Sequence, residues 1–252
     1  MGVNSYLGLH AEHYDVVYAD KPYEQEARFV HDQLTAAGTV PGRLLDVACG
    51  TGRHALHLRD LGWEVAGVDL NPELVERARA QAPGVDFHVG DMRSLSVPGG
   101  PFGAVTCLFD AVGYALTNQG VVAALSSMRE HLAEGGTAVV EFLHAPAMLR
   151  GARELGVRGW PLEDGGELVR IARTELDETA GTMTVGYDVI ALGADGSYRR
   201  SSEEQSNRFF AVEEMRALME AAGFAPRRFV AAYAADPEVT GETFHAMAVA
   251  AR

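Results

Sequence analysis

Residues 43–52 read RLLDVACGTG, a short apolar run that ends in an acidic residue and two closely spaced glycines. An apolar run of this length bounded by glycines is typical of a buried strand. The next residues, 54–62 (HALHLRDLG), have the apolar spacing of a helix. The turn between them is therefore predicted to join a strand to a helix N-terminus, where glycines let a ligand approach the backbone and free amides can bind it.

The same alternation continues outward from this turn to Leu143. Short apolar runs and amphipathic stretches follow one another: WEVAGVDL (63–70), PELVERARAQ (72–81), VDFHVGD (85–91), FGAVTCLFD (102–110), a helix over about 120–132 that ends at Glu134-Gly135-Gly136, and TAVVEFL (137–143). Strands that are apolar throughout and alternate with helices predict a parallel sheet covered by helices on both faces.

A different pattern begins after Pro146. Alternating residues in LVRIARTEL (168–176), TMTVGYDVIAL (182–192) and SYRRSSEEQSN (197–207) predict an antiparallel meander with one face in water. A periodic helix (212–224, stopping at Gly223) and two strands (226–233 and 243–251) close the chain. We expect an α/β fold with a doubly wound, mainly parallel, seven-stranded sheet formed by residues 1–145 and 209–252, with an N-terminal helical lid. An antiparallel β insert at 146–208 is predicted to cover the active site.

Composition narrows the classes of partner. The 252 residues are 47% hydrophobic and carry a formal charge of −14, which suits a globular protein and disfavours nucleic acid and anionic membranes as partners. We expect no signal peptide, and no apolar run reaches about 20 residues. Cys49 and Cys107 form no CxxC pair and are expected to be small buried groups, so a cytoplasmic location is predicted. The sequence leaves a homo-oligomer open.

The glycine turn admits two kinds of nucleotide cofactor. Residues 50–55 fit G-x-G-x-x-G/A and Asp69 ends the next predicted strand, which is also the fingerprint of dinucleotide-binding dehydrogenases. Against a dehydrogenase, Asp46 lies inside the first strand, where a pyrophosphate gains nothing from a carboxylate. A second acidic residue, Asp91, ends the third strand, where it could accept a hydrogen bond from an adenine amino group. No Tyr-x-x-x-Lys pair exists, because the sole lysine is Lys21.

As a set, DVACGTG (46–52), VDL (68–70), GDM (90–92) and FGAVTCLFDAVGY (102–114) resemble the successive motifs of class I S-adenosylmethionine-dependent methyltransferases. The resemblance implies a Rossmann-like sheet and S-adenosyl-L-methionine as cofactor. It places the methionine end against the backbone around Ala48 and Gly50 and beside Phe109, the ribose hydroxyls on Asp69 and the adenine on Asp91. The implied cofactor-binding residues are Asp46, Ala48, Gly50, Gly52, Asp69, Leu70, Asp91, Met92 and Phe109.

The N-terminal segment SYLGLHAEHYD (5–15) resembles small-molecule N-methyltransferases of antibiotic pathways, which act on nucleotide-linked amino sugars or on the amine of lincosamides. The resemblance implies that Tyr14 contacts the cofactor carboxylate, that Tyr6 faces the reacting centre and that Tyr114 lies beside the substrate. The chain departs from the amino-sugar enzymes at Asp110-Ala111, where they carry two serines. It departs again at 142–144 (FLH), where they carry Trp-Trp. These departures leave the acceptor open.

The chemistry of methyl transfer favours an amine acceptor. An amine with a pKa near 8 is roughly one-quarter neutral at pH 7.5, so it needs no strong base; Tyr6 and Tyr114 can orient it. An aliphatic hydroxyl would need a base, and His144, at the end of the fifth predicted strand, is the candidate for O-methylation of a sugar or polyketide. Asp110 could hold a substrate cation. A cofactor-binding module without catalysis is the further alternative, disfavoured by the intact glycine turn.

Metal and nucleic-acid chemistry are not indicated. His54 and His57 share a helix face but have no evident third ligand, so we interpret them as structural. The Asp-Asn pair of metal-dependent catechol-type enzymes is missing at Glu141-Phe142, and we predict no metal. The fourth strand lacks the Asn/Asp-Pro-Pro-Tyr sequence that grips a flipped adenine. A small molecule is therefore the expected methyl acceptor.

Overall fold

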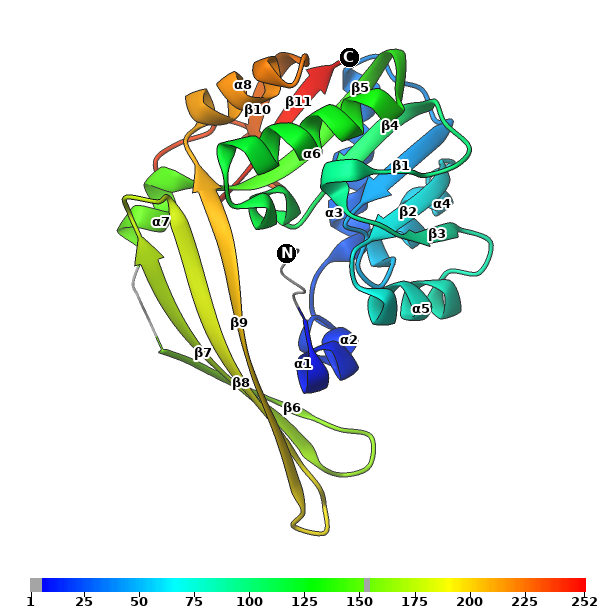
Figure 1. The fold of residues 1–252 in the computed structure, drawn as a ribbon. Helices are drawn as coiled ribbons and strands as arrows, with labels where there is room; N and C mark the ends of the chain where they lie inside the picture. The colour runs from blue at the N-terminus through cyan, green and yellow to red at the C-terminus, as the bar shows by residue number, and fades with distance from the viewer. Residues whose placement is uncertain (1–5, 152–154) are drawn as a thin grey trace.

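A mainly parallel sheet organises the chain in the computed structural model, which describes residues 6–151 and 155–252 (Figure 1). Five parallel strands lie in the order β3-β2-β1-β4-β5. Their bounds are β1 (Arg43–Val47), β2 (Glu64–Asp69), β3 (Asp86–Val89), β4 (Phe102–Cys107) and β5 (Leu132–His144). The chain order reverses between β1 and β4, which makes a crevice at the carboxyl ends of these two strands the expected ligand site.

Helices cover both faces of this sheet, as the alternation predicted. One face packs against α3 (Tyr23–Ala36), α4 (Arg53–Asp60) and α5 (Pro72–Gln81), and the other against α6 (Asn118–His131) and α8 (Val212–Ala221). Neighbouring residues of one strand enter opposite cores: Leu44 packs with α3 and α4, and Leu45 packs with α6. Among the described residues, no helix combines the length and the apolar character required to cross a membrane.

Antiparallel strands extend the sheet beyond β5. β11 (His245–Ala251) pairs with β5, and β10 (Ala225–Ala231) pairs with β11. After α7 (Ala145–Arg150), the insert forms β6 (Leu155–Pro161), β7 (Glu167–Asp177), β8 (Thr182–Leu192) and β9 (Tyr198–Phe210), which project from the core as a long ribbon (Figure 1).

The sheet differs from the predicted seven strands because the described strands form one sheet of eleven. The last two residues of β9, Phe209 and Phe210, pair in parallel with Leu143 and His144 of β5. The insert is thus hydrogen-bonded to the core sheet instead of forming a separate one. Its edge strand β6 was not predicted, since its sequence LGVRGWP contains two glycines and a proline.

Helix α6 ends at His131, one residue from the predicted end at Leu132, but Glu134-Gly136 does not separate it from the next strand as predicted. Strand β5 begins at once with Leu132 and contains these glycines. The register against β4 shifts from Phe102–Leu132 to Ala104–Thr137, so the intervening glycine-containing segment is an irregularity within the strand. Glycines tolerate such a bulge, and sequence alone does not distinguish it from a loop.

The N-terminal segment lies between the core sheet and the insert (Figure 1). The expected N-terminal helical lid consists of two short helices, α1 (Gly8–Glu12) and α2 (Tyr14–Val17), and Tyr6 precedes them with a left-handed φ of 63°. Leu9 and Val17 of these helices pack with apolar residues of the insert. Short 3₁₀ helices, η1 (Met92–Ser94) and η2 (Ala111–Ala115), follow β3 and β4.

Candidate active site

A cavity of about 740 Å³, including space at its open mouth, lies at the carboxyl ends of β1, β2 and β4. Most of the predicted site residues line it: Tyr6, Tyr14, Ala48, Gly50, Asp69, Leu70, Asp91, Met92, Phe109 and Tyr114. Val47, Val68, Asn71, Leu74 and Leu108 also contribute to its wall. A largely apolar wall with a few convergent polar groups is typical of a small-molecule site.

The glycine turn after β1 is held against the end of β2. Asp69 accepts the backbone N–H of Gly50 at 2.9 Å through Oδ2 and that of Asn71 at 2.8 Å through Oδ1. Ala48 and Gly50 both have left-handed φ angles, of 58° and 55°. Such a conformation is strained for alanine and is found where the surrounding structure fixes a functional turn.

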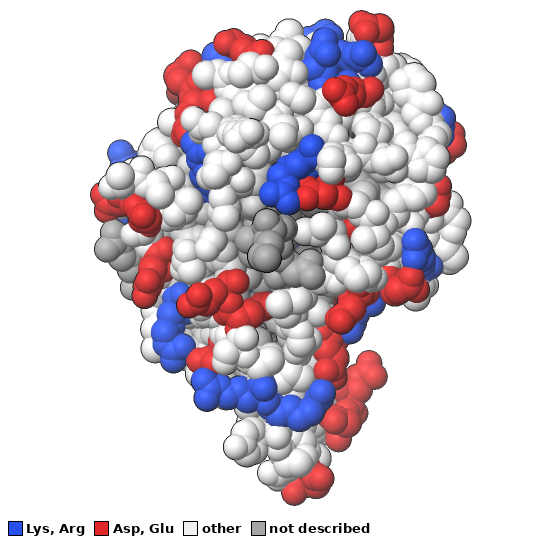
Figure 2. Space-filling model, viewed as in Figure 1, with Lys and Arg blue, Asp and Glu red and all other residues white. Residues whose placement is uncertain are grey.

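A second carboxylate, that of Asp91, lines the cavity after β3. The Arg93 guanidinium contacts both of its oxygens, and this hydrogen bonding holds the pKa of Asp91 below its ordinary value. Asp91 is therefore ionised at neutral pH and can accept a hydrogen bond from a ligand amino group. Over the viewed face of the molecule, basic and acidic side chains are interspersed (Figure 2).

Aromatic rings from the N-terminal segment and from the turn after β4 close one side of the cavity. Tyr6 meets Tyr14 with ring centroids 4.9 Å apart, Tyr14 meets Tyr18 at 4.7 Å, and Tyr18 meets Phe109 at 5.4 Å. Burial raises the pKa of both Tyr6 and Tyr14 well above the ordinary value. Both phenols are therefore neutral at physiological pH, so they can hold or orient a ligand but cannot act as phenolate bases.

Tyr114 of η2 connects the cavity to the insert. The Tyr114 hydroxyl donates to Oε1 of Gln205 on β9 at 3.3 Å, and Gln205 Nε2 donates to Glu203 at 2.7 Å. Glu203 in turn contacts Nδ1 of His10 on α1 at 2.5 Å. None of the residues Gln205, Glu203 and His10 was predicted from the sequence as a site residue. The period-2 spacing of Glu203 and Gln205, which places them on one face of a strand, was the available signal.

Asp46 and Gly52 do not line the main cavity. Asp46 is 2% exposed, its Oδ1 accepts the Thr106 hydroxyl at 2.8 Å, and it borders a smaller neighbouring hollow. Burial raises the pKa of Asp46 to about 6. A Cβ placed on Gly52 would lie 2.7 Å from the Phe87 ring, so this glycine is required by packing.

His144 and Asp110 also lie outside the wall of the main cavity. Nδ1 of His144 is 3.1 Å from the Thr243 carbonyl oxygen, although the residue ends β5 as predicted. Asp110 is 6% exposed, and its Oδ2 forms an ion pair with Nδ1 of His245 at 2.9 Å. Both side chains therefore have protein partners instead of facing the space where an acceptor would bind.

The smaller hollow adjoins the main cavity and shares Tyr14, Gly50 and Phe109 with it. Tyr23 and Arg53 also line this hollow, and the Arg53 guanidinium lies 5.1 Å from the centre of the Tyr23 ring. A cation beside a phenol at this position can bind a carboxylate.

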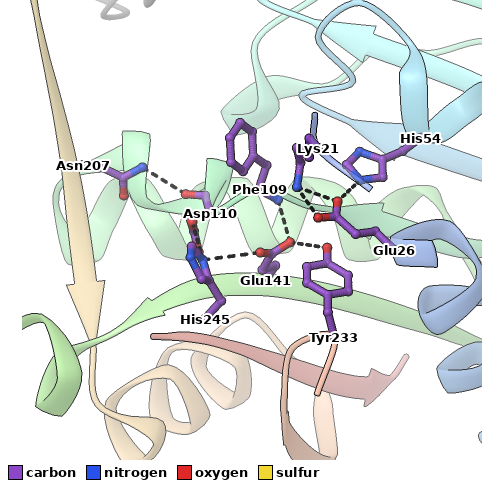
Figure 3. A network of polar contacts seen from close by, with 9 residues as sticks. All are labelled: Lys21, Glu26, His54, Phe109, Asp110, Glu141, Asn207, Tyr233 and His245. Atoms are coloured by element: carbon purple, nitrogen blue, oxygen red, sulfur yellow. Dashed lines mark hydrogen bonds and ion pairs between the residues drawn. The ribbon is translucent and has the colours of Figure 1, made fainter. Parts of the chain in front are cut away.

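His54 also borders the smaller hollow, where its Nε2 contacts Glu26 at 2.7 Å. Lys21 binds the same carboxylate at 2.5 Å and lies 4.5 Å from the centre of the Phe109 ring (Figure 3). His54 therefore has a structural partner, as the sequence analysis expected. The buried Cys49 and Cys107 are both free thiols.

Comparison with known proteins decides the family. A model of the methyltransferase domain matches residues 44–136. The dTDP-3-amino-3,4,6-trideoxy-α-D-glucopyranose N,N-dimethyltransferase of Streptomyces venezuelae is 33% identical over 85% of this chain and 89% of that protein. The dTDP-3-amino-3,6-dideoxy-α-D-glucopyranose N,N-dimethyltransferase of Streptomyces fradiae is 32% identical over 86% of this chain and 84% of that protein. The chain belongs to the S-adenosylmethionine-dependent N-methyltransferases.

Solved structures agree with this family. CalS10, an amino pentose methyltransferase of calicheamicin biosynthesis from Micromonospora echinaspora with S-adenosylmethionine bound, is 30% identical to this methyltransferase. It superposes with a TM-score of 0.77 over 99% of this chain and 98% of that chain. DesVI of Streptomyces venezuelae is 25% identical, with a TM-score of 0.80 over 96% and 99%. The methyltransferase thus uses S-adenosylmethionine, and its N-methylating relatives favour N- over O-methylation of a small molecule.

Proposed function

We propose that this N-methyltransferase methylates the amine of an amino sugar and that the main cavity holds its cofactor. One observation carries the proposal: the two strand-end carboxylates, Asp69 and Asp91, share a single cavity with Tyr6, Tyr14 and Tyr114. The two carboxylates can accept hydrogen bonds from the nucleoside of the cofactor. The tyrosines can contact the methyl end of the cofactor and the acceptor. Relatives at 32% and 33% identity that are named as dTDP-amino-sugar N,N-dimethyltransferases support the class of acceptor.

The cofactor would lie across the ends of the parallel strands. Asp69 is already oriented by two backbone N–H groups, and its remaining lone pairs would accept the ribose hydroxyls. Asp91, with Met92 and Leu70 beside it, would bind the adenine. The methionine end would follow the backbone of Ala48 and Gly50 past Phe109. Its carboxylate would meet the Tyr14 hydroxyl and enter the smaller hollow, where Arg53 supplies a positive charge.

The acceptor would approach from the side of the insert. Tyr6 comes from the N-terminal segment, and Tyr114 is tied through Gln205 to β9. In this arrangement residues 1–145 and 209–252 form the cofactor-binding domain, and the insert over 146–208 covers the acceptor. The buried polar pair Glu203 and Gln205 supplies oxygen acceptors at the boundary, where they could bind an amine or hydroxyl of the acceptor.

The chemistry requires positioning more than a base. S-adenosylmethionine supplies an electrophilic methyl group on a sulfonium. The neutral acceptor nitrogen attacks the methyl carbon in line, the carbon–sulfur bond electrons leave with sulfur, and the resulting ammonium loses a proton to water. Tyr6 and Tyr114 would orient the nitrogen lone pair, and the surrounding rings would favour the developing ammonium. O-methylation with His144 as the base gains no support, since His144 does not line the cavity.

Two measurements test this proposal. Calorimetric titration with S-adenosylhomocysteine and, separately, with NAD⁺ should show micromolar binding of the former only; binding of NAD⁺ alone would overturn the cofactor assignment. The enzyme should then be incubated with S-adenosylmethionine and a dTDP-linked amino sugar, with the matching hydroxyl sugar as control. We expect mass increases of one or two methyl groups on the amino sugar. Methylation of the hydroxyl sugar alone would refute N-methylation.

A further inference from the structure

The turn after β4 has an unusual backbone conformation. Phe109 and Asp110, neither of them glycine, have consecutive left-handed φ angles of 55° and 56°. Left-handed angles are unfavourable for residues with a Cβ and persist only where the surroundings impose them. This turn matters for the cavity, because Phe109 lies in its wall and Tyr114 follows in the 3₁₀ helix η2 that the turn begins.

Three strands contact the turn. The Phe109 N–H donates to Oε2 of Glu141 on β5 at 2.7 Å. The Asp110 carboxylate faces His245 on β11 at 2.9 Å, and the Asp110 carbonyl accepts Nδ2 of Asn207 on β9 at 3.2 Å (Figure 3). The turn is thus fixed at its amide, its side chain and its carbonyl by residues from three strands.

Of the three contacts, the one between the Asp110 carboxylate and His245 involves buried charges. Asp110 and Glu141 are only 6% and 1% exposed, and His245 Nδ1 lies 3.5 Å from Glu141 as well. Two buried carboxylates side by side are unfavourable without a cation. Burial and the charge of Asp110 raise the pKa of Glu141 to about 7. The neighbouring positive charge of His245 offsets part of this cost.

His245 can carry that charge at physiological pH. Burial lowers its pKa, but the contact with Asp110 and the charges of Asp110 and Glu141 outweigh burial and raise the pKa to about 9. Lys21, from the N-terminal segment, opposes protonation of His245. Tyr233, in the segment after β10, donates a hydrogen bond from its hydroxyl to Glu141 Oε2 at 2.7 Å, so Glu141 contacts both Tyr233 and His245.

We propose that His245 is a positioning residue, whose imidazolium pairs with Asp110 to hold Phe109 and Tyr114 at the cavity. The inference rests on the proposed assignment of this cavity to the cofactor. His245 itself does not line the cavity, and it acts through Asp110 and the turn. Deprotonation of His245 would leave two buried carboxylates unbalanced and release the turn.

The test measures the affinity for S-adenosylhomocysteine by calorimetry from pH 7 to pH 10, in the wild type and in H245Q. The amino group of this ligand titrates in the same range in both proteins, so the ratio of their Kd values isolates the imidazole. We expect H245Q to bind about tenfold more weakly at pH 7 to 8. With a pKa of about 9 for His245, the Kd ratio should fall about fivefold between pH 8 and pH 10, from about nine to about two, as the wild type loses its imidazolium.

Two further variants identify the partner and control for histidine loss. D110N should weaken binding as H245Q does, and the double variant should be no weaker than either, because both remove one ion pair. H88Q is the matched control, since His88 also pairs with an aspartate, Asp86, at 3.0 Å, but neither residue lines the cavity. H88Q should bind as the wild type does at every pH.

Two results would overturn the inference. A lower Tm of H245Q with a Kd ratio near one at all pH values would mean that His245 only stabilises the fold. The ligand atoms of Asp110, Glu141 and His245 lie within 4.8 Å of one another, a spacing that could also hold a metal. If the wild type loses binding in EDTA and regains it with Zn²⁺ or Mn²⁺, a metal ion and not a proton on His245 balances the two carboxylates.

A second measurement covers the case in which H245Q does not fold. NMR titration of the wild-type histidines should show one imidazole that stays protonated above pH 8 and whose pKa falls in D110N. If every histidine titrates near its ordinary pKa of about 6.5, the inference is wrong. Failure of the wild type to bind S-adenosylhomocysteine at all is a different result, since it would refute the cofactor site and not the role of His245.

Discussion

The rings of Tyr6 and Tyr14 meet edge to face, with their centroids 4.9 Å apart and their planes at 79°. Tyr6 precedes the first helix, and its carbonyl accepts Nδ2 of Asn71 at 3.0 Å after β2. The Tyr14 hydroxyl lies over Gly50, where an added Cβ would be 3.6 Å away. The pair therefore joins the N-terminal segment to the ends of β1 and β2. Because Tyr14 lies over the glycine turn and Tyr6 does not, the two tyrosines have different expected roles.

Tyr14→Phe should weaken cofactor binding, whereas Tyr6→Phe and Tyr114→Phe should mainly lower turnover. Loss of one hydroxyl hydrogen bond to a charged group corresponds to about 1.5–3 kcal/mol, or roughly ten- to 150-fold in Kd. Calorimetry with S-adenosylhomocysteine and the rate of amino-sugar methylation separate the two effects. Unchanged binding and turnover in all three variants would refute the proposed roles.

Asp69→Asn should weaken S-adenosylhomocysteine binding by about tenfold or more, because a charged acceptor of backbone and ribose hydrogen bonds becomes a neutral amide. The matched control is Asp60→Asn, at an exposed aspartate paired with Arg59 on α4. Titration calorimetry of both variants measures the change. Equal affinities of the two variants would remove Asp69 from the cofactor site.

Asp46→Asn should stabilise the fold at alkaline pH more than at acidic pH. Burial raises the pKa of Asp46 to about 6, so the folded protein binds the proton more tightly than the unfolded chain does. Ionisation therefore costs stability as pH rises from about 4 to 6, and the full cost, up to about 3 kcal/mol, is present above pH 6. Asparagine keeps an oxygen for the Thr106 hydroxyl and avoids this cost.

Urea unfolding at pH 5 and pH 8 checks the sign. The stability of D46N relative to the wild type should rise by about 1 kcal/mol from pH 5 to pH 8. Asp60→Asn again serves as the control and should show a pH-independent difference. A relative stability of D46N that falls with rising pH would contradict the raised pKa.

Gly52→Ala should destabilise the protein more than Gly38→Ala. Both glycines have left-handed φ angles, of 75° and 91°, but a Cβ at Gly52 meets the Phe87 ring at 2.7 Å, while Gly38 has no atom within 4 Å of that position. The angle alone costs about 1–2 kcal/mol in each variant. Denaturant unfolding should show an additional loss in G52A from the clash. Equal losses would show that the Phe87 ring moves aside freely.

Most residues predicted to bind the cofactor line one cavity, because they are local to successive strand ends. Ala48, Gly50, Asp69 and Asp91 each follow a buried strand, and parallel strands bring their carboxyl ends to one edge. Asp46 and Gly52, which do not line the main cavity, lie in the same motif. Alternation within a strand and packing of Phe87 turn them away from the main cavity, and neither effect is visible in the spacing.

The sequence by itself determined the parallel sheet, the glycine turn and the family, since apolar periodicity and short-range motifs record which backbone segments are buried and where a ligand can approach. Only the tertiary structure paired Asp110 with His245 and Tyr114 with Gln205. These partners are separated by 135 and 91 residues in the chain. Such contacts depend on the pairing of β11 and β9 with β5, and no local pattern encodes which distant strand brings a charge or an amide to the turn after β4.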